Sequence, residues 1–322
     1  MRNFISEDDI EQAILQKLEG DPFQYGILRC DPSPDKRELL PDGTGRSSKK
    51  ECVLPLILRE ALARLNPDIP GEKLEEIARD LCRDFSATDM TATNYKYYNQ
   101  IRNGIKISLR RNGKEDFDFV KLVDFDRPEN NTFTAVSQMW IQGRVYWRRP
   151  DVLIFINGLP MVFVELKNSI VKVEEAYNDN LKNYLRDIPN LFALNQICVL
   201  SNGLETRLGA FNATYNHFFE WLKVDSEKER PDRQALKEAG TVGESSVRYF
   251  IDGLLQKGRL IDYIENFIMF RNQKNKIIAK NHQYFGVNNL MESVKNRAEL
   301  QGKLGVFWHT QGSGKSLSLI HI

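Results

Sequence analysis

Two acidic residues and a lysine accompany a nearly continuous apolar stretch in the middle of the chain. Asp151 follows Pro150, and the triplet Glu165-Leu166-Lys167 comes fourteen residues later, with mostly apolar residues between them. Two carboxylates and an amine held on buried strands suit a divalent cation and a phosphodiester. The first hypothesis from these residues is therefore a metal-dependent nuclease.

Strand geometry decides whether these side chains can meet. Glu165 and Lys167 project from the same face, because residues i and i+2 of a strand do so. A hairpin centred on Gly158 places position 151 opposite 165, with cross-strand neighbours about 5 Å apart. A plain two-residue Asn157-Gly158 turn instead pairs 151 with 164 and puts Asp151 on the wrong face. The nuclease hypothesis therefore predicts a three-residue loop, a five-residue loop or a bulge.

The expected chemistry is Mg²⁺-dependent phosphodiester hydrolysis. Asp151 and Glu165 share the cation, the backbone carbonyl of Leu166 is a further ligand, and Lys167 orients a water or stabilises the transition state. The alternative is a surface ion pair between Glu165 and Lys167 on an edge strand, with Asp151 an ordinary strand-start residue. Burial of charge within an apolar run is costly and favours the functional interpretation.

Composition limits the other classes of function. The formal net charge is +1, so nucleic-acid binding must come from local patches or partner subunits. No apolar run reaches the roughly 18 residues of a membrane span, and the N-terminus lacks a signal-peptide core. We therefore expect a cytoplasmic protein that does not contact a membrane.

Hydrophobic periodicity predicts an α/β fold with a mixed central β-sheet flanked by helices, after an N-terminal helical region. Residues 31–50 are rich in Pro, Gly and Ser and predict a mobile loop, and 225–246 predict a linker. A long amphipathic helix is expected from 247 through Phe267. Expected helices cover 51–66, 71–85, 91–104 and 172–186, and expected strands cover 119–125, 133–145, 151–156, 161–167, 196–203 and 205–211.

The end of the chain carries a phosphate-loop pattern. Gly312-Ser-Gly-Lys-Ser316 follows an apolar strand. Backbone N–H groups of such a loop, at Gly312 and Gly314 among others, cradle phosphates, while Lys315 contacts the terminal ones and Ser316 ligates Mg²⁺. The chain stops six residues later, before a Walker B acid, so we expect the truncated start of a RecA-like lobe that does not hydrolyse ATP alone.

The motif Pro150-Asp151 with Glu165-Leu166-Lys167 resembles the PD-(D/E)xK nuclease signature. A wider and more specific resemblance is to the R (motor and endonuclease) subunit of type I restriction enzymes. It is carried by residues 148–168, 188–192, 200–203, 276–285 and 308–316. Gln283 stands where helicase-like motors place a glutamine that contacts adenine.

The resemblance implies a restriction-endonuclease-like domain over 1–240, whose helical part is 51–104, and a linker helix with the start of an ATPase/translocase domain over 241–322. It implies Mg²⁺ and ATP as cofactors. Its partners are double-stranded DNA, which the full complex cleaves after translocation, and the methylation (M) and specificity (S) subunits. Two alternatives remain: the nuclease domain of another helicase–nuclease, and a catalytically silent DNA-binding or assembly module.

Two further residues enter through the resemblance. RecB-like nucleases carry Gln-x-x-x-Tyr on the helix after Glu-x-Lys, and here Asn180 and Tyr184 occupy those positions. Tyr184 is either a site residue or a half-buried helix residue. Glu11 either matches an extra acidic residue of some such nucleases or is an exposed residue near a helix start.

Overall fold

A computed structural model describes residues 4–83, 89–111 and 114–302 of the chain. At its centre is a mixed sheet of seven strands in the order β1-β4-β7-β8-β9-β10-β11. The pairs β1/β4 and β8/β9 are parallel, and the other neighbours are antiparallel. The strands are β1 (Gly26–Arg29), β4 (Phe133–Ser137), β7 (Val152–Ile156), β8 (Leu159–Leu166), β9 (Ile197–Ser201), β10 (Thr206–Gly209) and β11 (Phe219–Glu220). The predicted mixed sheet flanked by helices is confirmed.

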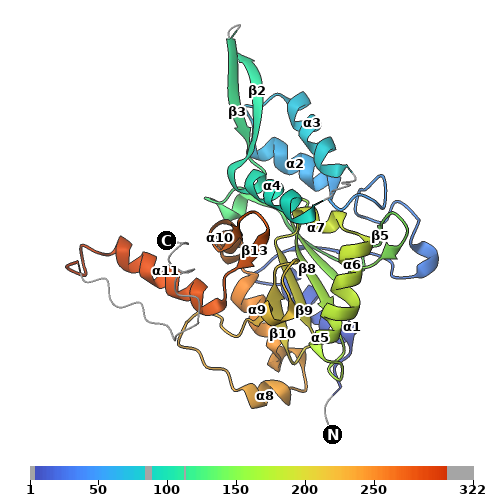
Figure 1. Ribbon diagram of the computed structural model, residues 1–322, viewed down its shortest axis with the longest axis vertical. Helices are drawn as coiled ribbons and strands as arrows, with labels where there is room; N and C mark the ends of the chain where they lie inside the picture. The colour runs from blue at the N-terminus through green and yellow to red at the C-terminus, as the bar shows by residue number, and fades with distance from the viewer. Residues whose placement is uncertain (1–3, 84–88, 112–113, 303–322) are drawn as a thin grey trace.

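Helices and short hairpins surround this sheet (Figure 1). The hairpin of β2 (Ile105–Arg111) and β3 (Lys114–Val120) projects at one end of the molecule, next to α2 (Pro55–Leu65) and α3 (Gly71–Cys82). Two further ladders are β5 (Ile141–Gln142) with β6 (Trp147–Arg148), and β12 (Ile268–Arg271) with β13 (Asn275–Ile278). The longer helices are α1 (Glu7–Glu19), α2 (Pro55–Leu65), α3 (Gly71–Cys82), α4 (Met90–Asn103), α9 (Ser246–Leu254), α10 (Lys257–Asn266) and α11 (Asn281–Lys295). None of the described helices is long and apolar enough to cross a membrane.

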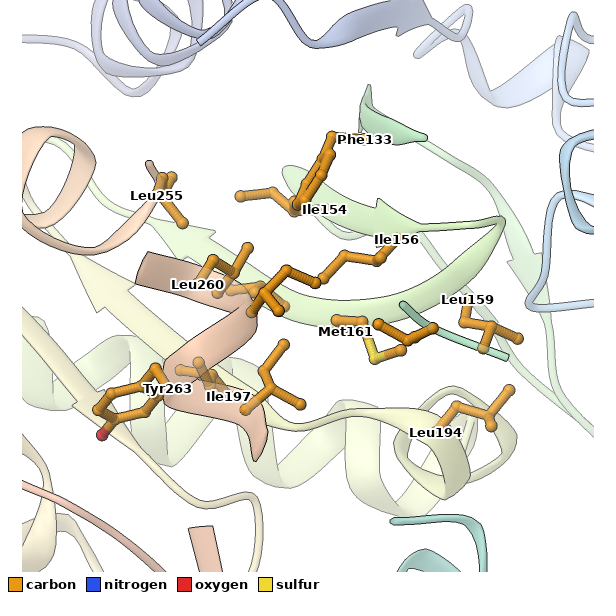
Figure 2. Close-up of a cluster of buried hydrophobic side chains, with 14 of the residues drawn as sticks. Phe133, Ile154, Ile156, Leu159, Met161, Leu194, Ile197, Leu255, Leu260 and Tyr263 are labelled. Carbon is orange, nitrogen blue, oxygen red and sulfur yellow. The ribbon is translucent and has the colours of Figure 1, made fainter. Parts of the chain in front are cut away.

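Both faces of the central strands are buried, which is why their sequences are almost continuously apolar. Ile154 and Val164 face a cluster that also contains residues of α1 and α10. Figure 2 shows part of this face, with Leu260 and Tyr263 of α10 over the sheet. Leu153 and Phe163 face the opposite cluster, which includes Leu181 and Tyr184 from the helical segment after β8. The central strands are therefore covered on both faces and support the side chains at their ends.

The β7–β8 hairpin has the geometry that the nuclease hypothesis requires. Asn157 and Gly158 adopt φ of 52° and 80°, and they alone separate the two strands. Both positive φ values are typical of a type I′ turn. A register shift between Ile154 and Phe155 then changes the pairing, so that Val152 lies opposite Val164. Of the three predicted alternatives, the structure has the bulge, and this brings position 151 level with 165.

Some expected elements differ from the observed ones. The helix expected from 247 to 267 is two helices, α9 and α10, because the chain is extended at Gln256. The Arg259 guanidinium donates to the carbonyl of Gly253 (2.8 Å), which satisfies the last turn of α9. Both helices share the core of the central sheet, so packing continues across the boundary predicted at 240. That boundary stays a prediction.

Strand lengths were also overestimated. The strand expected over 133–145 is interrupted after Ser137, and the one expected over 119–125 ends at Val120. The segment 31–50 contains one short turn, η1 (Pro34–Lys36), and otherwise irregular backbone. Its second half is nevertheless packed, since Arg46 and Lys49 are buried.

Candidate active site

Asp151 lies immediately before β7, with its carboxylate facing the end of β8. The Leu166 N–H donates to Asp151 Oδ2 at 2.7 Å, and the Gln138 N–H donates to the Asp151 carbonyl at 3.0 Å. Burial raises the pKa of Asp151 to about 6, against the hydrogen bond from Leu166 and the charge of Lys167. The carboxylate is thus fixed in position and easily protonated.

Glu165 is the penultimate residue of β8, a strand that lies between β7 and β9. Its side chain is 2% exposed, so the alternative of a surface ion pair on an edge strand is wrong. Oε1 accepts from Asn180 Nδ2, while Oε2 is buried and forms no hydrogen bond of normal length with the described residues, although the Tyr184 hydroxyl is close enough to lower the pKa of this carboxyl. Burial, with the charge of Asp151, raises the pKa of Glu165 well above its ordinary value.

Lys167 supplies a cation beside this carboxylate pair. Its Nζ donates to the Leu166 carbonyl at 2.9 Å and lies 3.4 Å from Glu165 Oε1. The Lys167 N–H donates to the carbonyl of Ser201 at 2.8 Å, which extends the pairing of β8 with β9 beyond Leu166. The structure therefore brings together the three residues that the sequence singled out, although their catalytic roles stay predictions.

Glu11 reaches the same region from α1. It is buried, which overturns its interpretation as an exposed residue, and burial raises its pKa to about 7. The side-chain amide of Gln138 donates to Glu11 Oε2 and lies 3.4 Å from Asp151 Oδ1. Sequence reasoning missed Gln138, which fell inside an expected strand. The one signal was a polar side chain next to apolar Met139 and Trp140.

The helical segment after β8 provides Asn180 and Tyr184. Residues Ala176–Leu181 form a π-helical stretch, a feature frequent at functional sites. Asn180 lies in it and binds Glu165, so the shorter amide reaches the carboxylate. Tyr184 is buried, and its hydroxyl donates to the Arg149 carbonyl at 2.9 Å, next to Pro150-Asp151. Its burial and the charge of Glu165 raise its pKa well above the ordinary value.

The donor set suits a hard cation that keeps water ligands. No group of three His, Cys, Asp or Glu side chains that could hold a metal occurs within the described part of the chain. A cation here would be held by the Asp151 and Glu165 carboxylates, with the Leu166 carbonyl as a further ligand. Mg²⁺ is commonly bound by one or two carboxylates and several waters. The buried Oε2 of Glu165, which forms no hydrogen bond of normal length with the described residues, is consistent with such a ligand set.

Of the predicted nucleotide-binding residues, the structure describes Gln283 alone. Gln283 lies in the first turn of α11, buried, and its Oε1 accepts from the Lys280 N–H at 2.8 Å. The phosphate-loop residues Gly312, Gly314, Lys315 and Ser316 lie outside the described residues. Nucleotide binding stays a prediction from the sequence.

Comparison with known proteins agrees with the resemblance. A type I restriction enzyme HindI endonuclease subunit from Haemophilus influenzae is 32% identical over 98% of this chain and 29% of its own length. A putative type I restriction enzyme MjaIXP endonuclease subunit from Methanocaldococcus jannaschii is 29% identical over 97% of this chain and 30% of its own length. The chain therefore spans under a third of these relatives.

Two family descriptions match different parts of the sequence. Residues 282–322 match the SWI2/SNF2 ATPase family. Residues 4–217, which include Glu11, Asp151, Glu165 and Lys167, match the family described as type I restriction enzyme R protein N terminus. Since this second match covers most of the chain, the protein belongs to the family of type I restriction enzyme R-protein N-terminal regions.

Proposed function

We propose that this region is the Mg²⁺-dependent nuclease part of a type I restriction R subunit, acting on double-stranded DNA. The observation that carries the proposal is the convergence of Asp151 and Glu165 at the ends of paired strands, beside Lys167. Both acids have raised pKa values, and Glu165 Oε2 forms no hydrogen bond of normal length with the described residues. Buried carboxylates short of positive partners are typical of cation-binding and catalytic sites.

Each residue has a distinct role in this proposal. Asp151 and Glu165 hold the cation, which, when bound, supplies Lewis-acid activation of a water and offsets phosphate charge. The Lys167 ammonium, held by the Leu166 carbonyl, orients that water or stabilises charge on the phosphate. Asn180 fixes the Glu165 carboxylate, and Tyr184 fixes the backbone before Asp151.

The wider assembly belongs to the same proposal. The relatives are named endonuclease subunits of type I restriction enzymes, and the C-terminal residues match an ATPase family. We infer that in the full-length protein an ATP-driven motor with a RecA-like lobe follows this region. Methylation and specificity subunits would select the DNA.

A supercoiled-plasmid assay tests the nuclease proposal. Wild-type protein is expected to nick or linearise the plasmid in Mg²⁺ and to stop when EDTA is added, whereas Asp151→Asn and Lys167→Ala are expected to be inactive. Glu75→Gln is a matched control, because Glu75 forms an ion pair with Arg59 at 2.8 Å, with both side chains substantially exposed. Activity that persists in Asp151→Asn and Lys167→Ala contradicts the assignment.

Cation binding gives a second measurement that does not depend on turnover. Mn²⁺ can be titrated into the protein and followed by its electron paramagnetic resonance signal. The wild type is expected to bind Mn²⁺, and Asp151→Asn is expected to lose at least about tenfold in affinity. Equal Mn²⁺ binding by both proteins would place the cation elsewhere.

A further inference from the structure

Gln138 has a backbone conformation that glutamine seldom adopts. It follows the last residue of β4 and has φ of 56°, in the left-handed region. Its N–H donates to the Asp151 carbonyl at 3.0 Å. Non-glycine residues in this region carry strain, and such residues cluster at functional sites.

The side chain of Gln138 joins two elements that are distant in sequence. Its Nε2 donates to Glu11 Oε2 on α1 and lies 3.4 Å from Asp151 Oδ1 before β7. Two carboxylates held this close repel each other when both are ionised, and the amide N–H groups lie between them. The amide therefore occupies a position that favours positive charge.

The other end of the same amide has no partner. Gln138 Oε1 is buried and accepts no hydrogen bond from the described residues. A buried acceptor without a donor is unfavourable, and native structures rarely keep one without a reason. Backbone strain and an unpartnered acceptor at one residue, beside the carboxylates, are both explained by a ligand in the site.

The helix that carries Glu11 is itself tied to the site. The Ile5 N–H donates to Ser169 Oγ at 2.9 Å, and the Ser169 N–H donates to the Ile5 carbonyl at 3.0 Å. Ser6 then begins α1 with a capping box formed with Asp9. The start of α1 is thus fixed to the loop after Lys167, and Gln138 fixes its second turn to Asp151.

We propose that Gln138 is a positioning residue of the cation site, one that links the Glu11 carboxylate to the carboxylate of Asp151, a proposed ligand of the cation. This inference rests on the proposed function. Gln138 acts through the two acids, without direct contact with the reacting phosphate.

Mn²⁺ binding by wild type, Gln138→Gly and Gln138→Asn tests this role. Gln138→Gly removes the amide and also relieves the backbone strain, so its melting temperature is expected to be unchanged or higher, while its Mn²⁺ affinity falls about tenfold. Gln138→Asn keeps a shorter amide and is expected to lie between the two. Gln24→Gly is the matched control, since Gln24 also has positive φ (50°) but is exposed and pairs with Asp21.

A double-mutant cycle separates positioning from general packing. Because Gln138 acts through Glu11 as well as Asp151, the loss of Mn²⁺-binding free energy in Glu11→Gln combined with Gln138→Gly should be smaller than the sum of the two single losses. Independent, additive losses would contradict the inference. Rescue is a further criterion: raising Mn²⁺ should restore cleavage by Gln138→Gly to within about threefold of wild type, because a weakened site can still be filled.

The outcomes distinguish the two proposals. Wild-type protein that binds no Mn²⁺ overturns both the cation site and the role of Gln138. If the wild type binds Mn²⁺ and Gln138→Gly binds it with the same affinity, only the role of Gln138 is overturned and the nuclease proposal stands. If Gln138→Gly fails to fold, the strain argument is contradicted, and Gln138→Asn decides whether the amide holds the acids.

Discussion

Two clusters of charged side chains in this protein differ in how their acids are balanced by cations. The Asp42 cluster consists of Asp42, Thr44, Arg46 and Lys49 in the segment 31–50. Arg46 and Lys49 contact Asp42 Oδ2 at 2.7 Å and 2.6 Å, and their side chains are 0% and 4% exposed. The candidate site instead gathers Asp151, Glu165 and Glu11 beside the Lys167 ammonium, and the Arg149 charge acts on Glu11 as a smaller influence.

The pKa values of the two clusters move in opposite directions. Burial by itself raises the pKa of Asp42, but the Arg46 charge and the hydrogen bonds from Lys49 and Thr44 outweigh it and hold the pKa well below its ordinary value. At the candidate site burial prevails, and the pKa values of Asp151 and Glu11 rise to about 6 and 7. A cluster with its charges satisfied stabilises the fold, whereas carboxylates short of cations are ready to bind one.

The two clusters are also physically connected. Arg46 donates to the Trp140 carbonyl at 3.1 Å, and the Gln142 N–H donates to the Lys49 carbonyl at 2.9 Å. Trp140 and Gln142 lie in the connection from Gln138 to Asp151, and the Arg149 guanidinium lies over the Trp140 ring. The Asp42 cluster therefore supports the backbone that positions the candidate site.

The largest expected effect is on catalysis. Glu165→Gln keeps the shape of the side chain but removes a charge that the proposed cation needs, so plasmid cleavage is expected to fall about a thousandfold or more, about 4 kcal/mol in activation free energy. Its free energy of unfolding should not decrease, because Glu165 has no buried cation comparable to Arg46. Cleavage kinetics and urea unfolding of the same preparations measure both. A strongly destabilised Glu165→Gln would show that this carboxylate is structural.

The reverse result is expected at the Asp42 cluster. Asp42→Asn leaves two buried cations without an acid and should lower the free energy of unfolding by about 3–5 kcal/mol. Glu75→Gln, in the exposed pair with Arg59, is the comparison and should cost no more than about 1 kcal/mol. Urea denaturation measures both variants. A loss below about 1 kcal/mol in Asp42→Asn would remove the contrast between the clusters.

The parts of the site that the sequence predicted are those set by local geometry. Asp151 and Glu165 lie on neighbouring strands, so strand periodicity and one turn determine whether they meet. The residue numbering alone shows that a plain two-residue turn cannot pair position 151 with 165. In the structure the register of the β7–β8 pairing shifts at a bulge between Ile154 and Phe155. The sequence could not choose between a bulge and a longer loop, because both give the same register.

The parts that were missed depend on contacts distant in sequence or on side-chain pairing. Gln138 and Glu11 are 127 residues apart, and no periodicity relates a residue of the first helix to one after β4. In the segment 31–50, Pro, Gly and Ser content predicts a mobile loop. Ion pairs between charged residues a few positions apart hold the second half of this segment in place. Such spacing is also common on exposed surfaces, so the sequence does not show that these pairs are buried.

The contrast extends to the pH dependence of stability. An acid whose folded-state pKa is raised favours folding below its unfolded pKa, and that contribution is lost as pH rises through the folded value. For Glu11 and Asp151 the loss falls between about pH 4 and 7. Without a divalent cation, the free energy of unfolding should fall by about 2 kcal/mol or more from pH 5 to pH 8.

Urea unfolding in EDTA at several pH values measures this dependence. In the double variant Glu11→Gln with Asp151→Asn the slope should be smaller, because two of the three acids with raised pKa values are gone and only Glu165 remains. The Asp42 carboxylate acts in the opposite sense: its stabilisation is present above the unfolded pKa near 4 and is lost only in more acidic solution. An equally steep loss between pH 5 and 8 in the double variant would assign it to other groups.

The smallest expected effect links the cation to stability. Mg²⁺ at ten times its dissociation constant should stabilise the wild type by about 1.4 kcal/mol, because it binds the folded state. At a fixed concentration the gain should be larger at pH 8 than at pH 5, where protons occupy Asp151 and Glu11 and compete with the cation. Thermal unfolding with and without Mg²⁺ at both pH values measures this, and in Asp151→Asn, whose cation affinity is at least about tenfold weaker, the gain should fall to about 0.4 kcal/mol or less. Asp42→Asn, once stable enough to measure, should keep the response, because its acid is already neutralised by Arg46 and Lys49. If Asp151→Asn and Asp42→Asn lose the Mg²⁺ response equally, the Asp42 cluster and the candidate site do not act independently.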